Sequence, residues 1–122
     1  MKMMQEIPHK YGTFTAEQIE EAKKEIRKQI IFLLSIVDPE LKEEYQFVDV
    51  NAAYHSLLDE LSGMNELLGE PAELVIVMSL LVAALNEYNS EDFAFSKYRK
   101  LVLDAGAKVN SIKGVSPDAN SQ

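Results

Sequence analysis

The sequence predicts an all-α fold, a compact four-helix bundle, on the strength of three observations. Apolar residues recur at steps of three and four along four separate segments. Capping residues, prolines and glycines stand at the boundaries of those segments, where helices begin and end. The links between the segments are short, which favours antiparallel neighbours. The long helices are expected at about residues 15–37, 50–68, 71–89 and 91–106, with a short helical turn at about 39–44.

The first helix has clear signals at both ends. Thr15 followed by Gln18 has the spacing of a capping box, in which each side chain bonds the backbone N–H of the other residue. Pro39 marks the end, because the residue before a proline avoids the helical conformation. Between these signals, one apolar face is formed by Ile19, Ala22, Ile26, Ile30, Leu33, Leu34 and Val37.

A turn and a connector precede the second helix. Residues 39–44 form the expected turn, and the connector that follows is expected to place Phe47 in the core. Asp49 or Asn51 then caps the second helix, and Gly69 ends it. The inward positions of this helix are Val50, Tyr54, Leu57, Leu58, Leu61, Met64 and Leu68.

The third helix is apolar on nearly every side, so it belongs either in the centre of the bundle or at an oligomer interface. Its β-branched residues, among them Ile76, leave a strand near Val75 as the alternative. Pro71 at the start and the length of the segment favour a helix. The residues predicted to lie in the core or at the interface are Val77, Met78, Leu81 and Leu85.

The fourth helix is predicted to begin with Ser90 as its cap and to end at Gly106. Its inward stripe consists of Ala94, Tyr98, Leu101, Val102 and Ala105. A basic cluster, Lys97, Arg99 and Lys100, is then expected on the outer face. Three cations give only weak, salt-sensitive binding to nucleic acid, so a DNA contact is a minor alternative.

The bundle domain is expected to span residues 15–109, between an N-terminal arm at 1–14 and a flexible C-terminal tail at 110–122. The first residues contain no apolar stretch of the kind found in signal peptides. The longest apolar run, residues 74–85, is too short to span a membrane. These observations predict a cytoplasmic protein that does not enter a membrane.

Composition excludes several classes of function. The chain has 122 residues and no cysteine, which excludes a disulfide framework, a cysteine-ligated metal site and a thiol nucleophile. It has 20 acidic and 12 basic side chains, for a net charge of −8, which argues against a general nucleic-acid binder.

The charge is unevenly distributed along the chain. Residues 38–92 carry a net charge of −12, whereas residues 1–37 carry +1 and residues 93–122 carry +3. An acidic surface speeds encounter with a basic partner through electrostatic steering. The residues predicted to form this partner-binding surface are Glu43, Glu44, Asp59, Glu60, Glu66 and Glu70.

No catalytic constellation is recognisable in the sequence. His9 stands alone in the arm, and His55 has only Asp59 on the same helical face, whereas a metal site needs further ligands. The glycines do not have the spacing of a phosphate-binding loop. We therefore expect a protein that is not an enzyme and that uses no metal or cofactor.

The resulting hypothesis is a non-enzymatic interaction protein that binds a basic protein through an acidic face and forms a homo-oligomer, most simply a dimer. Short acidic helical proteins are often adaptors, inhibitor or immunity-type proteins, or accessory proteins of phages and mobile elements. The alternative is a bundle with a site between its second and third helices. That site would hold a small apolar ligand, lined by Tyr54, Met64 and Met78, or a metal bound by His55 and Asp59.

Overall fold

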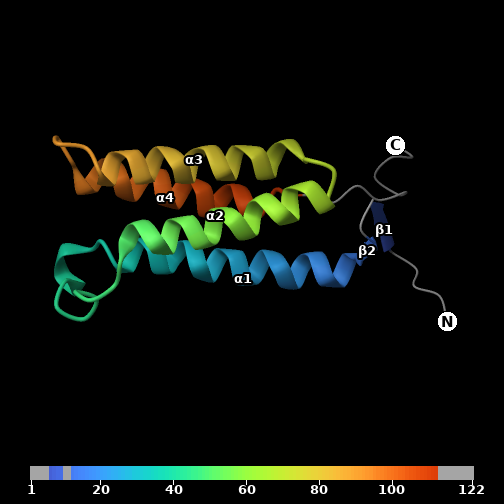
Figure 1. The fold of residues 1–122 in the computed structure, drawn as a ribbon, viewed down its shortest axis with the longest axis horizontal. Helices are drawn as coiled ribbons and strands as arrows, with labels where there is room; N and C mark the ends of the chain where they lie inside the picture. Colours follow the sequence, from blue (N-terminus) through green and yellow to red (C-terminus); the bar gives the residue numbers. More distant parts are fainter. Residues whose placement is uncertain (1–5, 10–11, 113–122) are drawn as a thin grey trace.

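The four predicted helices are present, and each runs antiparallel to the next one in the chain (Figure 1). The computed structural model describes residues 6–9 and 12–112. Its helices are α1 (Ala16–Ser35), α2 (Val50–Leu67), α3 (Ala72–Tyr88) and α4 (Phe95–Val109). The most extensive packing is between α3 and α4, α4 also packs on α1, and α2 contacts both α1 and α3. The prediction of an all-α four-helix bundle is confirmed, and the segment around Val75 is helical rather than a strand.

The predicted caps set the ends of the helices. At the start of α1 the Thr15 hydroxyl accepts a hydrogen bond from the Gln18 N–H at 3.0 Å, and the Gln18 side chain accepts one from the Thr15 N–H at 2.9 Å. The Asp49 carboxylate accepts from the Ala52 N–H at 3.0 Å at the start of α2. Gly69 ends α2 with a φ of 81°, a left-handed conformation that glycine adopts without steric cost.

Helix α4 differs from its prediction at both ends. The Ser90 hydroxyl caps a turn instead, accepting from the Asp92 N–H, and the first helical residue is Phe95. The Glu87 side chain of α3 accepts from the Ala94 N–H at 2.8 Å, so the start of α4 is set by a tertiary contact. Gly106 does not end the helix, which continues to Val109, and a Cβ at position 106 would make ordinary van der Waals contact with the Ile30 side chain of α1 at 3.6 Å.

Two short strands, β1 (Glu6–His9) and β2 (Gly12–Thr15), pair antiparallel. They lie in the segment predicted as an arm, residues 1–14, and β2 extends one residue beyond it. This pair of strands was not predicted from the sequence. At the other end, residues 113–122 of the predicted tail lie outside the described residues. Residues 110–112 belong to the bundle, because Ile112 is buried in the core.

Two tyrosines lie at the centre of the core and link three helices. The Tyr54 hydroxyl on α2 donates to the Tyr98 hydroxyl on α4 at 2.9 Å, and the latter donates to the Leu33 carbonyl on α1 at 2.7 Å. Burial raises the pKa of Tyr54 to about 12 and raises the pKa of Tyr98 as well. Both side chains are therefore neutral hydrogen-bonding groups at physiological pH.

Candidate functional site

The α1–α2 connector (residues 36–49) is an ordered segment at one end of the bundle (Figure 1). Its first part is the 3₁₀ turn η1 (Pro39–Leu41), in which the Asp38 carboxylate accepts from the Glu40 N–H at 2.9 Å. Backbone hydrogen bonds continue through the connector, from Glu44 to Leu41 and from Val48 to Tyr45, each at 3.0 Å. The connector therefore has a defined backbone, although most of it is irregular.

The side chains of the connector point in two directions. Tyr45 packs edge-on against Phe32 of α1, with ring centroids 5.8 Å apart, and Val48 packs on the core. Phe47 between them is 92% exposed, so the prediction that it lies in the core is wrong. The reason is that Tyr45 and Val48 already occupy the positions facing the bundle, which leaves Phe47 on the solvent side of the turn.

Acidic residues flank Phe47 in the sequence. Residues 38–49 contain five acidic side chains and one lysine, a net charge of −4. Glu43 and Glu44, two of the predicted partner-binding residues, are exposed on this segment. A shallow groove where the connector meets the bundle is lined in part by Val37, Tyr45 and Tyr88. The connector thus combines an apolar side chain, negative charge and a neighbouring depression.

The other predicted acidic residues lie elsewhere. Asp59, Glu60 and Glu66 are exposed along α2, and Glu70 lies in the α2–α3 turn at the opposite end of the bundle (Figure 1). The 18 residues of α2 span about 27 Å, so the six predicted residues form no single patch. Of these six residues, only Glu43 and Glu44 lie on the same connector as Phe47.

The predicted interface residues of α3 divide into two kinds. Val77 and Leu81 are fully buried in the core, and Met78 and Leu85 are partly buried against it. The exposed apolar side chains of α3 are instead Val75, Ile76 and Val82. Val75, Ile76 and Val82 form a second apolar stripe at helical spacing, on the face opposite the buried one. Periodicity reveals both stripes, but it does not determine which of them faces the core.

The histidine and carboxylate that were considered as metal ligands, His55 and Asp59, are both exposed on α2. His9 lies in β1, where it pairs with Gly12 in the strand register. In the part of the chain that the structure describes, no three histidine, aspartate or glutamate side chains are grouped as a metal site would require.

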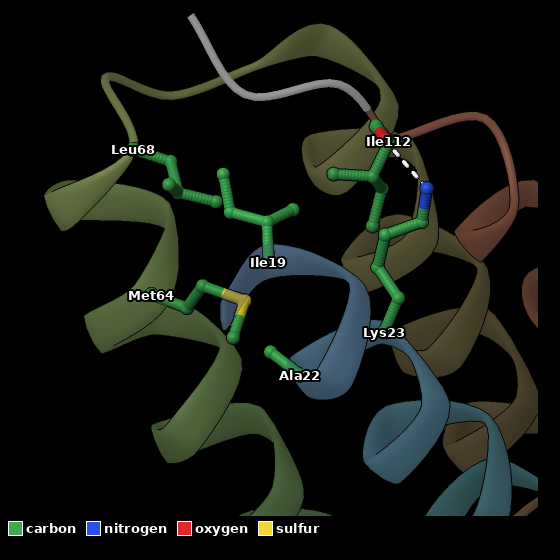
Figure 2. A pocket seen from close by; sticks show the side chains of 6 residues that line it. All are labelled: Ile19, Ala22, Lys23, Met64, Leu68 and Ile112. Atoms are coloured by element: carbon green, nitrogen blue, oxygen red, sulfur yellow. Dashed lines mark hydrogen bonds between the residues drawn. The ribbon is translucent and has the colours of Figure 1, made fainter. Parts of the chain in front are cut away.

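The core contains a small cavity between α1, α2 and the end of α4, with a volume of about 10 Å³ (Figure 2). It is lined by Ile19, Ala22, Lys23, Met64, Leu68 and Ile112. This volume is close to the minimum for a single water. Tyr54 and Met78, which were expected to line a ligand cavity together with Met64, do not reach it, because Tyr54 is in the core centre and Met78 lines an outer groove.

The most unusual polar residue of the core is Lys23, whose burial was not predicted from the sequence. The residue is only 7% exposed, and its ammonium donates to the Ile112 carbonyl at 3.0 Å (Figure 2). The ammonium also donates to the Asn110 carbonyl at 3.3 Å. It therefore satisfies carbonyls just beyond the end of α4, where a positive charge also interacts favourably with the helix dipole. The role of Lys23 is structural.

The basic cluster on α4 lies on the outer face, as predicted. Lys97 is 3.5 Å from a carboxylate oxygen of Glu87, and Lys100 is 3.0 Å from one of Asp104. These ion pairs reduce the positive charge available to a phosphate backbone. Among the described residues, no helix is both long and apolar enough to cross a membrane.

Comparisons with known proteins provide no assignment: no protein family model, no curated protein and no solved structure matches this chain.

Proposed function

We propose that this protein is a non-enzymatic interaction module that binds a basic protein partner through the α1–α2 connector. Phe47 is the apolar anchor of this contact, and Glu43 and Glu44 supply its charge. The observation that carries the proposal is the 92% exposure of Phe47 on a connector whose backbone is hydrogen-bonded. Burial of an exposed aromatic side chain by a partner lowers the free energy of the complex. Such residues contribute most of the binding energy at many interfaces.

The order of the connector supports this role. Its turns are hydrogen-bonded, and Tyr45 and Val48 attach it to the bundle, so little conformational entropy is lost when a partner binds. A flexible loop with the same side chains would lose more conformational entropy on binding. The connector therefore resembles a preformed ligand for a pocket on another protein.

Charge determines the class of partner. The net charge of −4 on residues 38–49 lies within a segment of −12, and such a field attracts a basic surface and repels an acidic one. A suitable partner has an apolar pocket for Phe47 with lysine or arginine side chains around it. The attraction should weaken as salt is added.

The proposal is tested by affinity capture with matched variants. Immobilised wild-type protein is compared with Phe47→Ala and with the double variant Glu43→Gln and Glu44→Gln, using a native cell lysate and quantitative mass spectrometry. The control is Phe93→Ala on the α3–α4 loop, an aromatic residue that is 38% exposed and packs against Tyr88 and Tyr98, so circular dichroism must first show its fold unchanged. We expect one basic protein to be recovered by the wild type and the control, and to be lost with Phe47→Ala.

Binding constants for the recovered protein then test the mechanism. Loss of a buried aromatic anchor costs about 2–3 kcal/mol, which corresponds to a dissociation constant raised about 30- to 150-fold. The double glutamine variant should mainly slow association and reduce the dependence on salt. Equal recovery by the wild type and by Phe47→Ala would contradict the proposal.

A further inference from the structure

Helix α3 carries two apolar stripes, and the bundle covers only one of them. The covered stripe is Leu74, Val77, Leu81 and Ala84, all fully buried. The second, which we name the α3 outer stripe, consists of Ala72, Val75, Ile76, Ser79, Val82, Ala83 and Asn86. Val75, Ile76 and Val82 on this stripe are 41–44% exposed, and a shallow groove lined by Asn65, Val75, Met78, Ser79 and Val82 runs along its α2 side.

The α3 outer stripe is uncharged in a strongly acidic protein. No ionisable residue occurs between Glu73 and Glu87, although the chain carries a net charge of −8. Its one central polar group is Ser79, whose hydroxyl already donates to the Val75 carbonyl at 3.0 Å. Burial of Ser79 against another apolar surface therefore leaves no donor without a partner.

The order of side chains along this stripe is nearly symmetric about Ser79. Counting outward in both directions, Ile76 matches Val82, Val75 matches Ala83, and Ala72 matches Asn86. The large Ile76 and Val82 therefore lie on either side of a small central residue, with Val75 level with Ala83 and Ala72 level with Asn86 further out. Two such helices in antiparallel register place Ile76 against the partner's Val82 and bring their backbones close at Ser79.

We propose that the α3 outer stripe binds a second copy of this chain, with the two α3 helices antiparallel and the two-fold axis at Ser79. This surface is separate from the connector around Phe47, so the inference does not rest on the proposed function. It uses other residues than the four predicted to lie in the core or at the interface, since Val77 and Leu81 are buried in the core and Met78 and Leu85 are partly buried against it.

Charge distinguishes the antiparallel from the parallel arrangement. In a parallel pair, Glu73 of each copy lies level with the partner's Glu73, which is repulsive. In the antiparallel pair, Glu73 lies level with the other end of the partner's α3, where Lys97 and Glu87 are 3.5 Å apart and largely offset each other's charge, so the repulsion is weaker. Opposed helix dipoles also favour the antiparallel pair.

The size of the stripe predicts a dimer of moderate affinity. From Ala72 to Asn86 it spans about 21 Å, and one helix face of that length buries less than the roughly 800 Å² per partner of a typical stable interface. We therefore expect a dissociation constant in the micromolar range. Because two chains of charge −8 repel each other, added salt should strengthen the dimer, whereas it should weaken binding of a basic partner.

Sedimentation equilibrium from about 5 to 500 µM tests the association. We expect a monomer–dimer equilibrium for the wild type, and at least a tenfold weaker one for the double variant Ile76→Glu and Val82→Glu. Both positions are exposed in the monomer, so circular dichroism should show the fold unchanged. Ile31→Glu on α1, at a position 50% exposed and away from α3, is the matched control and should leave the dimer intact. A wild type that stays monomeric throughout this range overturns the proposal.

Disulfide trapping tests the register, because the chain contains no cysteine. Ser79→Cys alone should cross-link to itself under mild oxidation, since two-fold symmetry brings the two positions together. In a mixture of Ile76→Cys and Val82→Cys chains, the mixed disulfide should exceed both self-disulfides. Self-disulfides of each variant in place of the mixed one would indicate a parallel pair and overturn the antiparallel arrangement.

Discussion

Replacement of Lys23 by methionine tests whether a buried ammonium holds the end of α4 to α1. Methionine keeps most of the apolar length of the side chain but has no hydrogen-bond donor. The change leaves the Ile112 carbonyl, which Lys23 contacts at 3.0 Å, and the Asn110 carbonyl, at 3.3 Å, without their charged donor. The bond to Glu20 contributes little, because the Glu20 side chain is largely exposed.

The size of the effect follows from these contacts. A hydrogen bond from a charged donor contributes about 1.5–3 kcal/mol, and removal of the buried charge recovers part of its desolvation cost. We expect a net loss of about 2 kcal/mol in the free energy of unfolding. With an unfolding entropy of about 2.1 cal/mol/K per residue, a chain of this length should melt about 8 °C lower.

Thermal and denaturant unfolding of Lys23→Met measure this loss, and hydrogen exchange locates it. The amides of Asn110, Ser111 and Ile112 should exchange faster than in the wild type, because their turn loses its attachment to α1. Lys24→Met is the control, since Lys24 is exposed, and its stability should change by less than about 0.5 kcal/mol. A Lys23→Met protein as stable as the wild type would refute the reasoning, because desolvation would then outweigh the hydrogen bonds.

Four further predictions concern stability. Ile112→Ala should lower the free energy of unfolding by about 3 kcal/mol in urea titration, since Ile112 is core rather than tail; a change below about 1 kcal/mol would contradict its burial. Phe47→Ser should change stability by less than about 0.5 kcal/mol in the same assay, because the ring is exposed. Asn65→Leu should raise the melting temperature by a few degrees, as it removes a buried side-chain oxygen without a hydrogen-bond partner among the described groups; a lower melting temperature would argue against this. Because burial raises the pKa of Tyr54 to about 12 and that of Tyr98 as well, the folded state holds their protons more tightly than the unfolded state. Stability should therefore be complete below about pH 10 and fall as the pH rises towards 12, with two of the five tyrosines ionising only on unfolding in an absorbance titration.

Local signals were sufficient to predict the four helices of this protein and most of their ends, those of α4 excepted. The Thr15 capping box, the Asp49 cap and Gly69 act within a few residues of their own position, so each could be read from the sequence. The start of α4 could not, because the Glu87 side chain, seven residues earlier on another helix, accepts from the Ala94 N–H.

The candidate surfaces were harder to predict, because they depend on which side chains the core leaves out. Phe47 is apolar and was expected inside, but Tyr45 and Val48 fill the inward positions of its segment. Ile112 continues the steps of three and four through Ala105 and Val109, but it lies beyond Gly106, where the helix was expected to end. Lys23 is buried only because carbonyls nearly ninety positions later in the chain approach it.

The contacts between α1 and the end of α4 also constrain the synthesis of this protein. Leu33 receives its hydrogen bond from Tyr98, and Lys23 meets its carbonyl partner only at Ile112. At about 5–20 residues per second, a ribosome needs roughly 4–15 s to extend the chain from the end of α1 to residue 112. During that time the apolar face of α1 lacks its α4 partner, so the nascent chain presents this face to chaperones before the bundle closes.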